Sequence, residues 1–68
     1  MAILKVIEIM ASSDKSWEDA TRLGIQTAAR TVKEIRSVYV HDMSALVDGD
    51  KITQFRVNLR ISFEVKAE

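Results

Sequence analysis

The C-terminal part of the chain alternates apolar and polar residues almost without interruption, and this pattern constrains the fold more than any other feature. The alternation runs over residues 52–65, and one of its two faces carries Thr53, Phe55, Val57, Leu59, Ile61, Phe63 and Val65. Because successive side chains of a β-strand point to opposite faces, the run predicts one long strand with a dry face and a polar face.

The predicted strand is long for the domain that contains it. The chain has 68 residues, which make a single domain over residues 1–68. Such a strand spans roughly 43 Å, whereas a compact domain of this size has a radius of gyration of about 11 Å. The chain has no cysteine, so disulfides cannot support its small core. We therefore expect the strand to bend or to reach neighbouring subunits, as in a symmetric homo-oligomer.

A strand and a helix precede this run. Residues 3–11 are β-branched and apolar enough to form a strand. Ser16 and Asp19 resemble a capping box, which predicts a helix over residues 16–35 with Lys33 and Arg36 near its end. The helix presents one stripe of mostly small residues, namely Trp17, Ala20, Gly24, Ala28, Thr31 and Ile35. Such a stripe allows a sheet to approach the helix closely.

A second strand is predicted at residues 37–47, and Asp48-Gly49-Asp50 then forms a turn because Gly49 tolerates a positive φ. The element order is β-α-β-β. We therefore expect an α+β fold, in which a three-stranded antiparallel sheet curves around one helix.

Charge and composition exclude several functions. Ten basic residues balance ten acidic ones, which argues against a nucleic-acid binder or a polybasic membrane-surface protein. The N-terminus lacks the features of a signal peptide, so we expect a cytoplasmic location. Strict alternation would place His41 and Asp42 on opposite faces of their strand, which excludes an acid–base pair. The sequence therefore predicts a binding protein and not an enzyme.

Three groups of residues are candidates for binding. Glu8 and Asp42, with other carboxylates, would supply oxygen ligands to a hard cation, although the two aspartates beside Gly49 also suit a plain turn. Arg56 and Arg60 share the polar face of the long strand, where they would bind an anion or form salt bridges between subunits. Trp17 would stack on a planar ligand or pack inside the domain.

Several segments together resemble the dodecin family. They are the opening strand KVIEI, the helix entry from Ser12 to Ala20, the segment AARTV at 28–32, the Asp48-Gly49 turn and the closing ITQFRVNLRISFEV. The resemblance covers nearly the whole chain. It implies a β-α-β-β subunit with a strongly bent sheet, and a hollow homododecamer that binds small ligands, in many members flavins.

The resemblance also implies which residues line the ligand site. Flavin-binding dodecins stack the flavin ring on a tryptophan at the position of Ser37, and hold its polar edge with a glutamine at the position of Arg56. Bacterial members often carry an arginine where this chain has Ser44, whereas the acidic residue is kept as Asp42. Without the tryptophan the site loses stacking energy. These departures are similar to a branch described as calcium dodecins.

Two interpretations follow for the ligand. In the first, Ser37, Asp42 and Arg56 line a site for FMN or riboflavin with weakened or altered affinity. In the second, the protein binds Ca²⁺ or Mg²⁺ through carboxylates such as Glu8 and Asp42, or forms a purely structural shell. In both, the expected partners are copies of the chain itself and a small ligand, with neither nucleic acid nor membrane.

Overall fold

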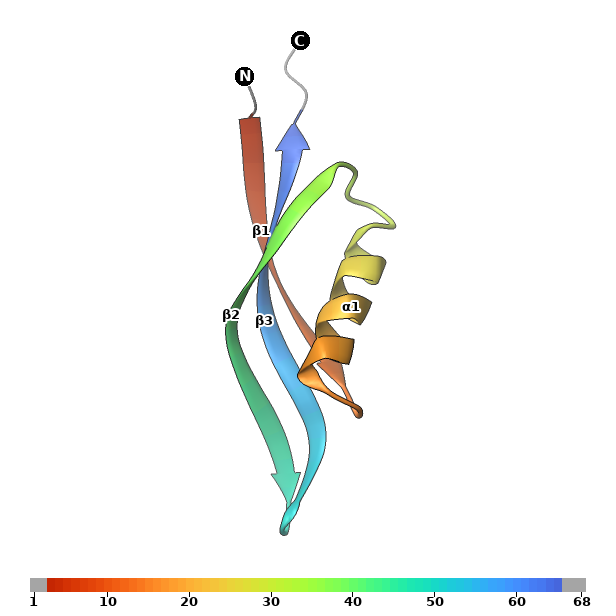
Figure 1. The fold of residues 1–68 in the computed structure, drawn as a ribbon, viewed down its shortest axis with the longest axis vertical. Coiled ribbons are helices and arrows are strands. Elements are labelled where there is room, and N and C mark those ends of the chain that lie inside the picture. Colours follow the sequence, from red (N-terminus) through yellow and green to blue (C-terminus); the bar gives the residue numbers. More distant parts are fainter. Residues whose placement is uncertain (1–2, 66–68) are drawn as a thin grey trace.

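A computed structural model describes residues 3–65 of the chain. Its elements are β1 (Ile3–Ser13), α1 (Trp17–Ala28), β2 (Ile35–Asp48) and β3 (Lys51–Val65) (Figure 1). The predicted order β-α-β-β is therefore confirmed. Within the described residues, no helix is long and apolar enough to cross a membrane.

The three strands form one antiparallel sheet in the order β1-β3-β2. The long alternating strand β3 lies in the centre and pairs with both neighbours, so that Leu59 lies opposite Ile9 on one side and Val40 on the other. The helix α1 packs on one face of the sheet, mainly against β1 and β3 (Figure 1). The opposite face has no covering element within residues 3–65.

The sheet is bent, as expected. The pairing of β2 with β3 shifts register at three places, between Ile35 and Ser37, between Val40 and Asp42, and near the hairpin between Leu46 and Val47. A bulge of this kind bends the strand and increases its twist. The result is the curved course of β2 and β3 in Figure 1.

The core lies between α1 and the middle of β3. Its four fully buried apolar residues are Ala20, Val57, Leu59 and Ile61. Three of them belong to the predicted dry face of the long strand, which is confirmed in its middle, whereas Phe55, Phe63 and Val65 are partly buried and Thr53 is exposed. Other apolar residues surround them at partial burial, namely Ile7, Ile9, Ala11, Trp17, Ile25, Ala28 and Ile35.

Gly24 allows the helix to approach the sheet closely, as its place on the small-residue stripe predicts. A Cβ atom at Gly24 would lie 2.9 Å from Leu59 Cδ1 and 3.2 Å from Ala11 Cβ. Both distances are shorter than ordinary van der Waals contact between carbon atoms. Close packing therefore favours glycine at this position, despite its cost of about 1 kcal/mol in a helix interior.

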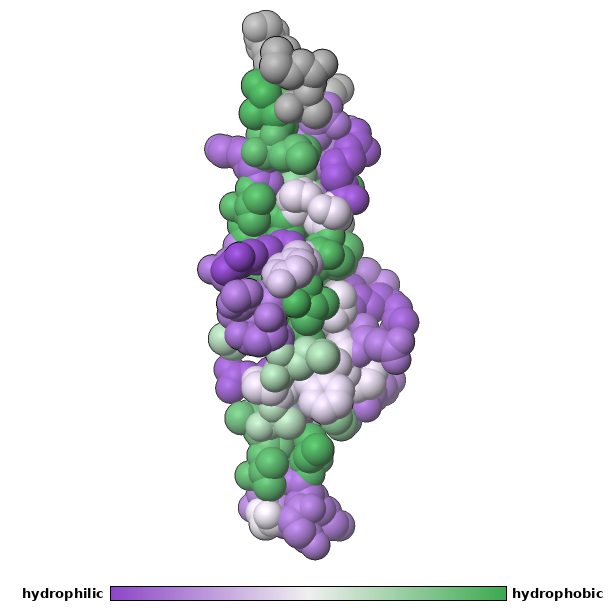
Figure 2. Space-filling model, turned by 60° about the vertical axis from the view of Figure 1, so that its left-hand side comes forward, coloured by the Kyte–Doolittle hydropathy of each residue, from purple (hydrophilic) through white to green (hydrophobic). Residues whose placement is uncertain are grey.

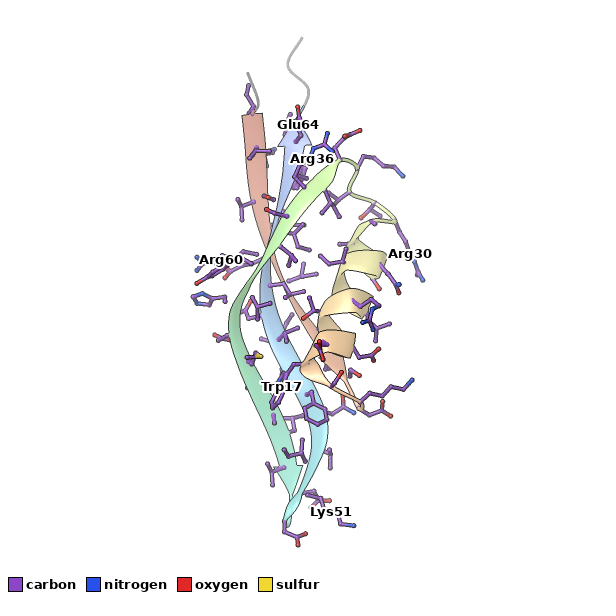
Figure 3. All side chains as sticks on the ribbon, in the orientation of Figure 1. Trp17, Arg30, Arg36, Lys51, Arg60 and Glu64 are labelled. Atoms are coloured by element: carbon purple, nitrogen blue, oxygen red, sulfur yellow. The ribbon has the colours of Figure 1, made fainter. Side chains whose placement is uncertain are left out.

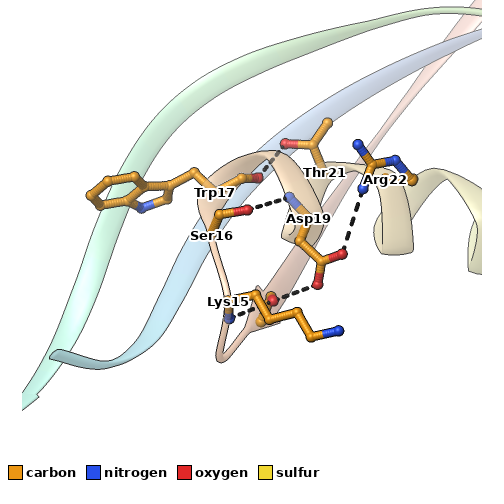
Figure 4. A network of polar contacts seen from close by, with 7 residues as sticks. Lys15, Ser16, Trp17, Asp19, Thr21 and Arg22 are labelled. Atoms are coloured by element: carbon orange, nitrogen blue, oxygen red, sulfur yellow. Dashed lines mark hydrogen bonds and ion pairs between the residues drawn. The ribbon is translucent and has the colours of Figure 1, made fainter.

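The helix begins in a compact network of polar contacts (Figure 4). Ser16 is the N-cap residue, and its Oγ accepts a hydrogen bond of 2.9 Å from the backbone N–H of Asp19. The Asp19 carboxylate in turn accepts a 2.6 Å hydrogen bond from the hydroxyl of buried Ser13, and Arg22 approaches it at 3.5 Å. The predicted capping residues are confirmed, but the carboxylate bonds Ser13 and not the N-cap backbone.

Replacing Ser16 by alanine is expected to lower the free energy of unfolding by about 1 kcal/mol, because the N–H of Asp19 loses its cap. Urea denaturation at a fixed protein concentration measures this change. The matched control is Ser12→Ala, at an exposed position of β1. Equal stability of Ser16→Ala and the wild type would contradict the capping role.

The predicted end of the helix is wrong. The helix ends at Ala28, whereas the stripe pattern extended it to residue 35. The segment after Ala28 contains the β-branched residues Thr31 and Val32, which fit a helix less well. Glu34 then adopts a left-handed φ of 63°, and its carbonyl accepts a 2.9 Å hydrogen bond from the N–H of Glu64. This contact directs the chain into β2, which begins at Ile35.

This correction moves residues 29–35 out of the predicted helix, among them Thr31, Lys33 and Ile35, and Arg36 belongs to β2 instead of the region of the helix end. Of the residues in the last helical turn, none is basic. Ile35 instead begins β2 opposite Phe63 and still packs on the core. Its apolar spacing therefore reflected burial and not helical geometry.

The described chain is strongly elongated. Its principal extents are 54 × 19 × 13 Å, and its radius of gyration of 14.0 Å exceeds the value of about 11 Å expected for a compact chain of this length. The β2–β3 hairpin extends past the N-terminal end of the helix (Figure 1). The inference that the long strand does not fit inside a compact globule is confirmed.

Candidate ligand-binding face

The sheet face opposite α1 carries the binding residues that the sequence predicted. We call it the polar sheet face. Its members follow from the register of the strands: Leu4, Val6, Glu8, Met10 and Ser12 of β1; Gln54, Arg56, Asn58, Arg60, Ser62 and Glu64 of β3; and Ser37, Tyr39, Asp42, Ser44 and Leu46 of β2. The central strand supplies most of the polar groups, and its neighbours flank them with mixed polar and apolar side chains.

Arg60 is paired with a carboxylate of its own chain. Its Nε lies 3.3 Å from Glu8 Oε2 on β1, and Tyr39 lies opposite it on β2. The ring of Tyr39 is 6.4 Å from the ring of His41. Because Glu8 neutralises it, Arg60 is a weak candidate for binding an anion.

Arg56 is half-buried and forms no ion pair with any residue of 3–65. Its Nη2 lies 3.1 Å from the sulfur of Met10, and Ser44 lies opposite it on β2. A thioether is a weak acceptor and carries no charge. The positive charge of Arg56 is therefore uncompensated within the described chain and free to attract an anionic ligand.

Ser37 lies far from Arg56. It pairs with Ser62, with which it shares a short hydrogen bond between the two hydroxyls. Ser62 and Arg56 are six positions apart on the same strand, which corresponds to roughly 20 Å. A single chain therefore does not bring Ser37 and Arg56 to one small ligand.

Asp42 lies near the middle of the polar sheet face and is exposed. It is opposite Asn58, and Arg56 is the diagonal neighbour on β3. Within residues 3–65 no ion pair involves Asp42. Its carboxylate is thus available, with an amide and the Ser44 hydroxyl close by along the strands.

Strict alternation fails at His41, contrary to the sequence argument. The register shift between Val40 and Asp42 makes His41 the extra residue of a bulge, and at a bulge two consecutive residues oppose one residue of the partner strand. His41 and Asp42 are therefore not forced to opposite faces. No hydrogen bond joins the two side chains in the structure.

Glu8 and Asp42 are not brought together in one chain. They lie on β1 and β2, with β3 between them, so their backbones are separated by roughly 10 Å. Across residues 3–65, no three His, Asp or Glu side chains gather closely enough to hold a metal ion. The carboxylates of residues 3–65 therefore do not form a complete cation site within one chain.

Trp17 lies on the helix side of the sheet and belongs to the packing of the domain. Its ring meets the ring of Phe55 edge-on, at a centroid distance of 4.9 Å and an interplanar angle of 79° (Figure 3). Its Nε1 donates a 2.9 Å hydrogen bond to the carbonyl of Ser44. Of the two interpretations of Trp17, packing is the one that the structure supports.

Two features of the face were missed by the sequence analysis. Arg36 joins two carboxylates, Glu34 at 2.8 Å and Glu64 at 3.0 Å, and so ties the start of β2 to β3 (Figure 3). Asn58 lies between Met10 and Asp42 at the centre of the face. Alternation places Asn58 on the polar face of β3, but the cross-strand neighbours of Asn58 and of Arg36 follow from the strand register, which no local pattern reveals. The predicted turn at Gly49 is confirmed by its φ of 66°.

Comparison with known proteins places this geometry in context. The family model described as dodecin matches residues 3–66. A curated relative, calcium dodecin of Mycobacterium tuberculosis, is 33% identical over 66 residues, which are 97% of this chain and 93% of the relative. A crystal structure of calcium dodecin from that organism, described as having a novel calcium-binding site, matches with a TM-score of 0.81 and 35% identity over 94% of this chain and 91% of the other.

Solved structures with lower identity support the same fold. Dodecin from Streptomyces coelicolor matches with a TM-score of 0.92 at 16% identity, over 98% of this chain and 96% of that chain. At this identity the match shows the shared architecture of the subunit.

Proposed function

The chain belongs to the dodecin family, and on that premise we propose that it is a non-enzymatic binding protein. Its copies assemble into a hollow homododecamer that holds divalent cations, Ca²⁺ or Mg²⁺, on the polar sheet face. The similarity to a protein named calcium dodecin supports this choice of ligand. The exposed apolar surface of the elongated chain supports the other part of the proposal, the assembly of several copies, because such surface favours self-association.

The observation that carries the proposal is the environment of Asp42. This carboxylate is exposed, has no cationic partner within residues 3–65, and lies beside Asn58 and Ser44. Carboxylate, amide and hydroxyl oxygens are the ligands that hard cations prefer. Ca²⁺ takes six to eight oxygen ligands, which is more than one chain offers here. Copies of Asp42 gathered around a symmetry axis would complete the site.

A flavin is the second ligand class, and Arg56 is the residue that favours it. A half-buried guanidinium with an uncompensated charge would lie flat on a flavin ring or bind the phosphate of FMN. Ser37 at the stacking position removes an aromatic contact worth about 0.5–1.5 kcal/mol. In this interpretation Ser37, Asp42 and Arg56 of different subunits line the site, since one chain holds the first and the last far apart.

Titration calorimetry with Ca²⁺ and Mg²⁺ on chelator-treated protein tests the proposal. We expect Asp42→Asn to weaken cation binding by at least about tenfold, because it removes a charged ligand while keeping the shape of the side chain. The matched control is Asp14→Asn, an exposed aspartate between β1 and α1, which should bind as the wild type does. The same titration on Glu8→Gln tests the other candidate carboxylate.

An absence of binding heat at millimolar Ca²⁺ and Mg²⁺, or an unchanged affinity of Asp42→Asn, would contradict the cation proposal. Quenching of flavin fluorescence distinguishes the second ligand class. If the wild type quenches flavin fluorescence and Arg56→Ala does not, the ligand is a flavin and Arg56 contributes to its binding.

A further inference from the structure

The chain exposes more surface than a compact protein of its size. Its accessible area is 5191 Å², whereas a folded monomer of 7.7 kDa exposes roughly 4,300 Å². The excess of roughly 900 Å² is close to the area that each partner buries in a standard interface. The amount of surface therefore suits burial against a second protein chain of comparable size.

Part of this surface forms an apolar tip at the end of the β2–β3 hairpin. Leu46, Val47 and Ile52 are exposed by 44%, 63% and 51%. The hairpin carries them beyond the helix, and Figure 2 shows apolar residues gathered just above its charged end. We call these three residues the hairpin tip. Val47 and Ile52 face each other across the two strands, and about half or more of the surface of Val47 and Ile52 stays exposed within residues 3–65.

A groove of matching character lies between α1 and the outer edge of β1. It has a volume of about 450 Å³ and is lined by Ile9, Ala11, Leu23, Thr27 and Thr31 among others. β1 is an edge strand, so its outer backbone groups have no partner strand within residues 3–65. A volume of this size accommodates a few aliphatic side chains, and an occupant would also cover the edge.

The charges beside the two surfaces are complementary. Asp48 and Asp50 flank the hairpin tip, with Lys51 next to them, and Arg30 and Lys33 follow the last turn of α1 beside the groove residue Thr31. Arg30 points away from the sheet at this end of the helix (Figure 3). Neither the two aspartates nor Arg30 and Lys33 form an ion pair within residues 3–65. An acidic tip thus faces a basic rim when the two surfaces meet.

We propose that the hairpin tip of one chain seats in the α1–β1 groove of a second copy of the same chain. The paired strands hold the tip away from the groove of its own chain, so the contact joins different chains. Such a contact uses two different surfaces and therefore propagates until it closes into a ring or shell. The inference rests on the self-assembly in the proposed function and names the surfaces that perform it.

Introduced cysteines test the contact cleanly, because the chain has none of its own. The test variant carries Thr27→Cys in the groove and Val47→Cys on the hairpin tip. The matched control carries Glu18→Cys, on the exposed first turn of the helix outside the groove, together with Val47→Cys. Both are oxidised mildly and compared on non-reducing gels, with native mass spectrometry of the reduced proteins.

We expect a ladder of covalent multimers in the test variant, with at least about five times the cross-linking of the control, because cysteines bridge only when their Cα atoms come within about 7 Å. Equal cross-linking in both variants, while native mass spectrometry reports a multimer, would overturn the tip-in-groove contact and leave the assembly standing. A monomeric mass would overturn both.

Discussion

Leu59→Ala is expected to lower the free energy of unfolding by about 3–4 kcal/mol, because Leu59 is one of the largest fully buried side chains of the described residues. Leu59 is fully buried at the centre of the sheet, between Ile9 and Val40 and under Gly24 of the helix. The truncation removes apolar contact and leaves a cavity that the paired strands cannot collapse to fill. Only four apolar side chains are fully buried among the residues described, so little remains to compensate.

Urea denaturation at a fixed chain concentration measures this loss, since the stability of an assembling protein depends on concentration. The matched control is Leu4→Ala, which makes the same change at a position of β1 that is 53% exposed. A loss in Leu59→Ala no larger than in Leu4→Ala would show that the core is not where the structure places it.

Gly24→Val is expected to destabilise the protein by about 2–3 kcal/mol through overpacking. Its Cβ would meet Leu59 Cδ1 and Ala11 Cβ at distances that require one of them to move. Valine is a better helix former than glycine by a few tenths of a kcal/mol, which is too little to offset the clash. Gln26→Val, at an exposed position of the same helix, controls for helix propensity.

The two substitutions together form a double-mutant cycle. In the chain with both Leu59→Ala and Gly24→Val, the added methyl groups would occupy the space that the leucine vacated. We expect the double variant to be more stable than the sum of the single losses predicts, by about 1–2 kcal/mol. Strict additivity would mean that the helix does not touch Leu59 at this position.

The sequence predicted the central strand and the core well because both depend on a local pattern. Alternation with a period of two assigns each side chain of β3 to a face without knowledge of the rest of the fold. The same rule identified Val57, Leu59 and Ile61 as buried and Arg56 and Arg60 as members of the opposite face. The small-residue stripe likewise predicted the close approach at Gly24.

The end of the helix and the arrangement of the candidate site could not be predicted from the sequence, because both depend on contacts between segments that are distant along the chain. The helix ends at Ala28, and the chain enters β2 where the carbonyl of Glu34 accepts a hydrogen bond from the N–H of Glu64, which is distant in sequence. The separation of Ser37 from Arg56, and the bulge at His41, follow from how β2 registers against β3. Such features arise only when strands pair, and no periodicity within one segment encodes them.

The odd-numbered and even-numbered residues of β3, the central strand of the sheet, face opposite sides and have different roles. Odd-numbered residues from Val57 to Ile61 hold the fold together, and the even-numbered residues between them face the candidate ligand surface. A combinatorial library restricted to even positions of β3 would therefore vary recognition while leaving the hydrophobic core intact. For the same reason, substitutions at the even positions during evolution would change what the protein binds without changing the residues that stabilise its fold.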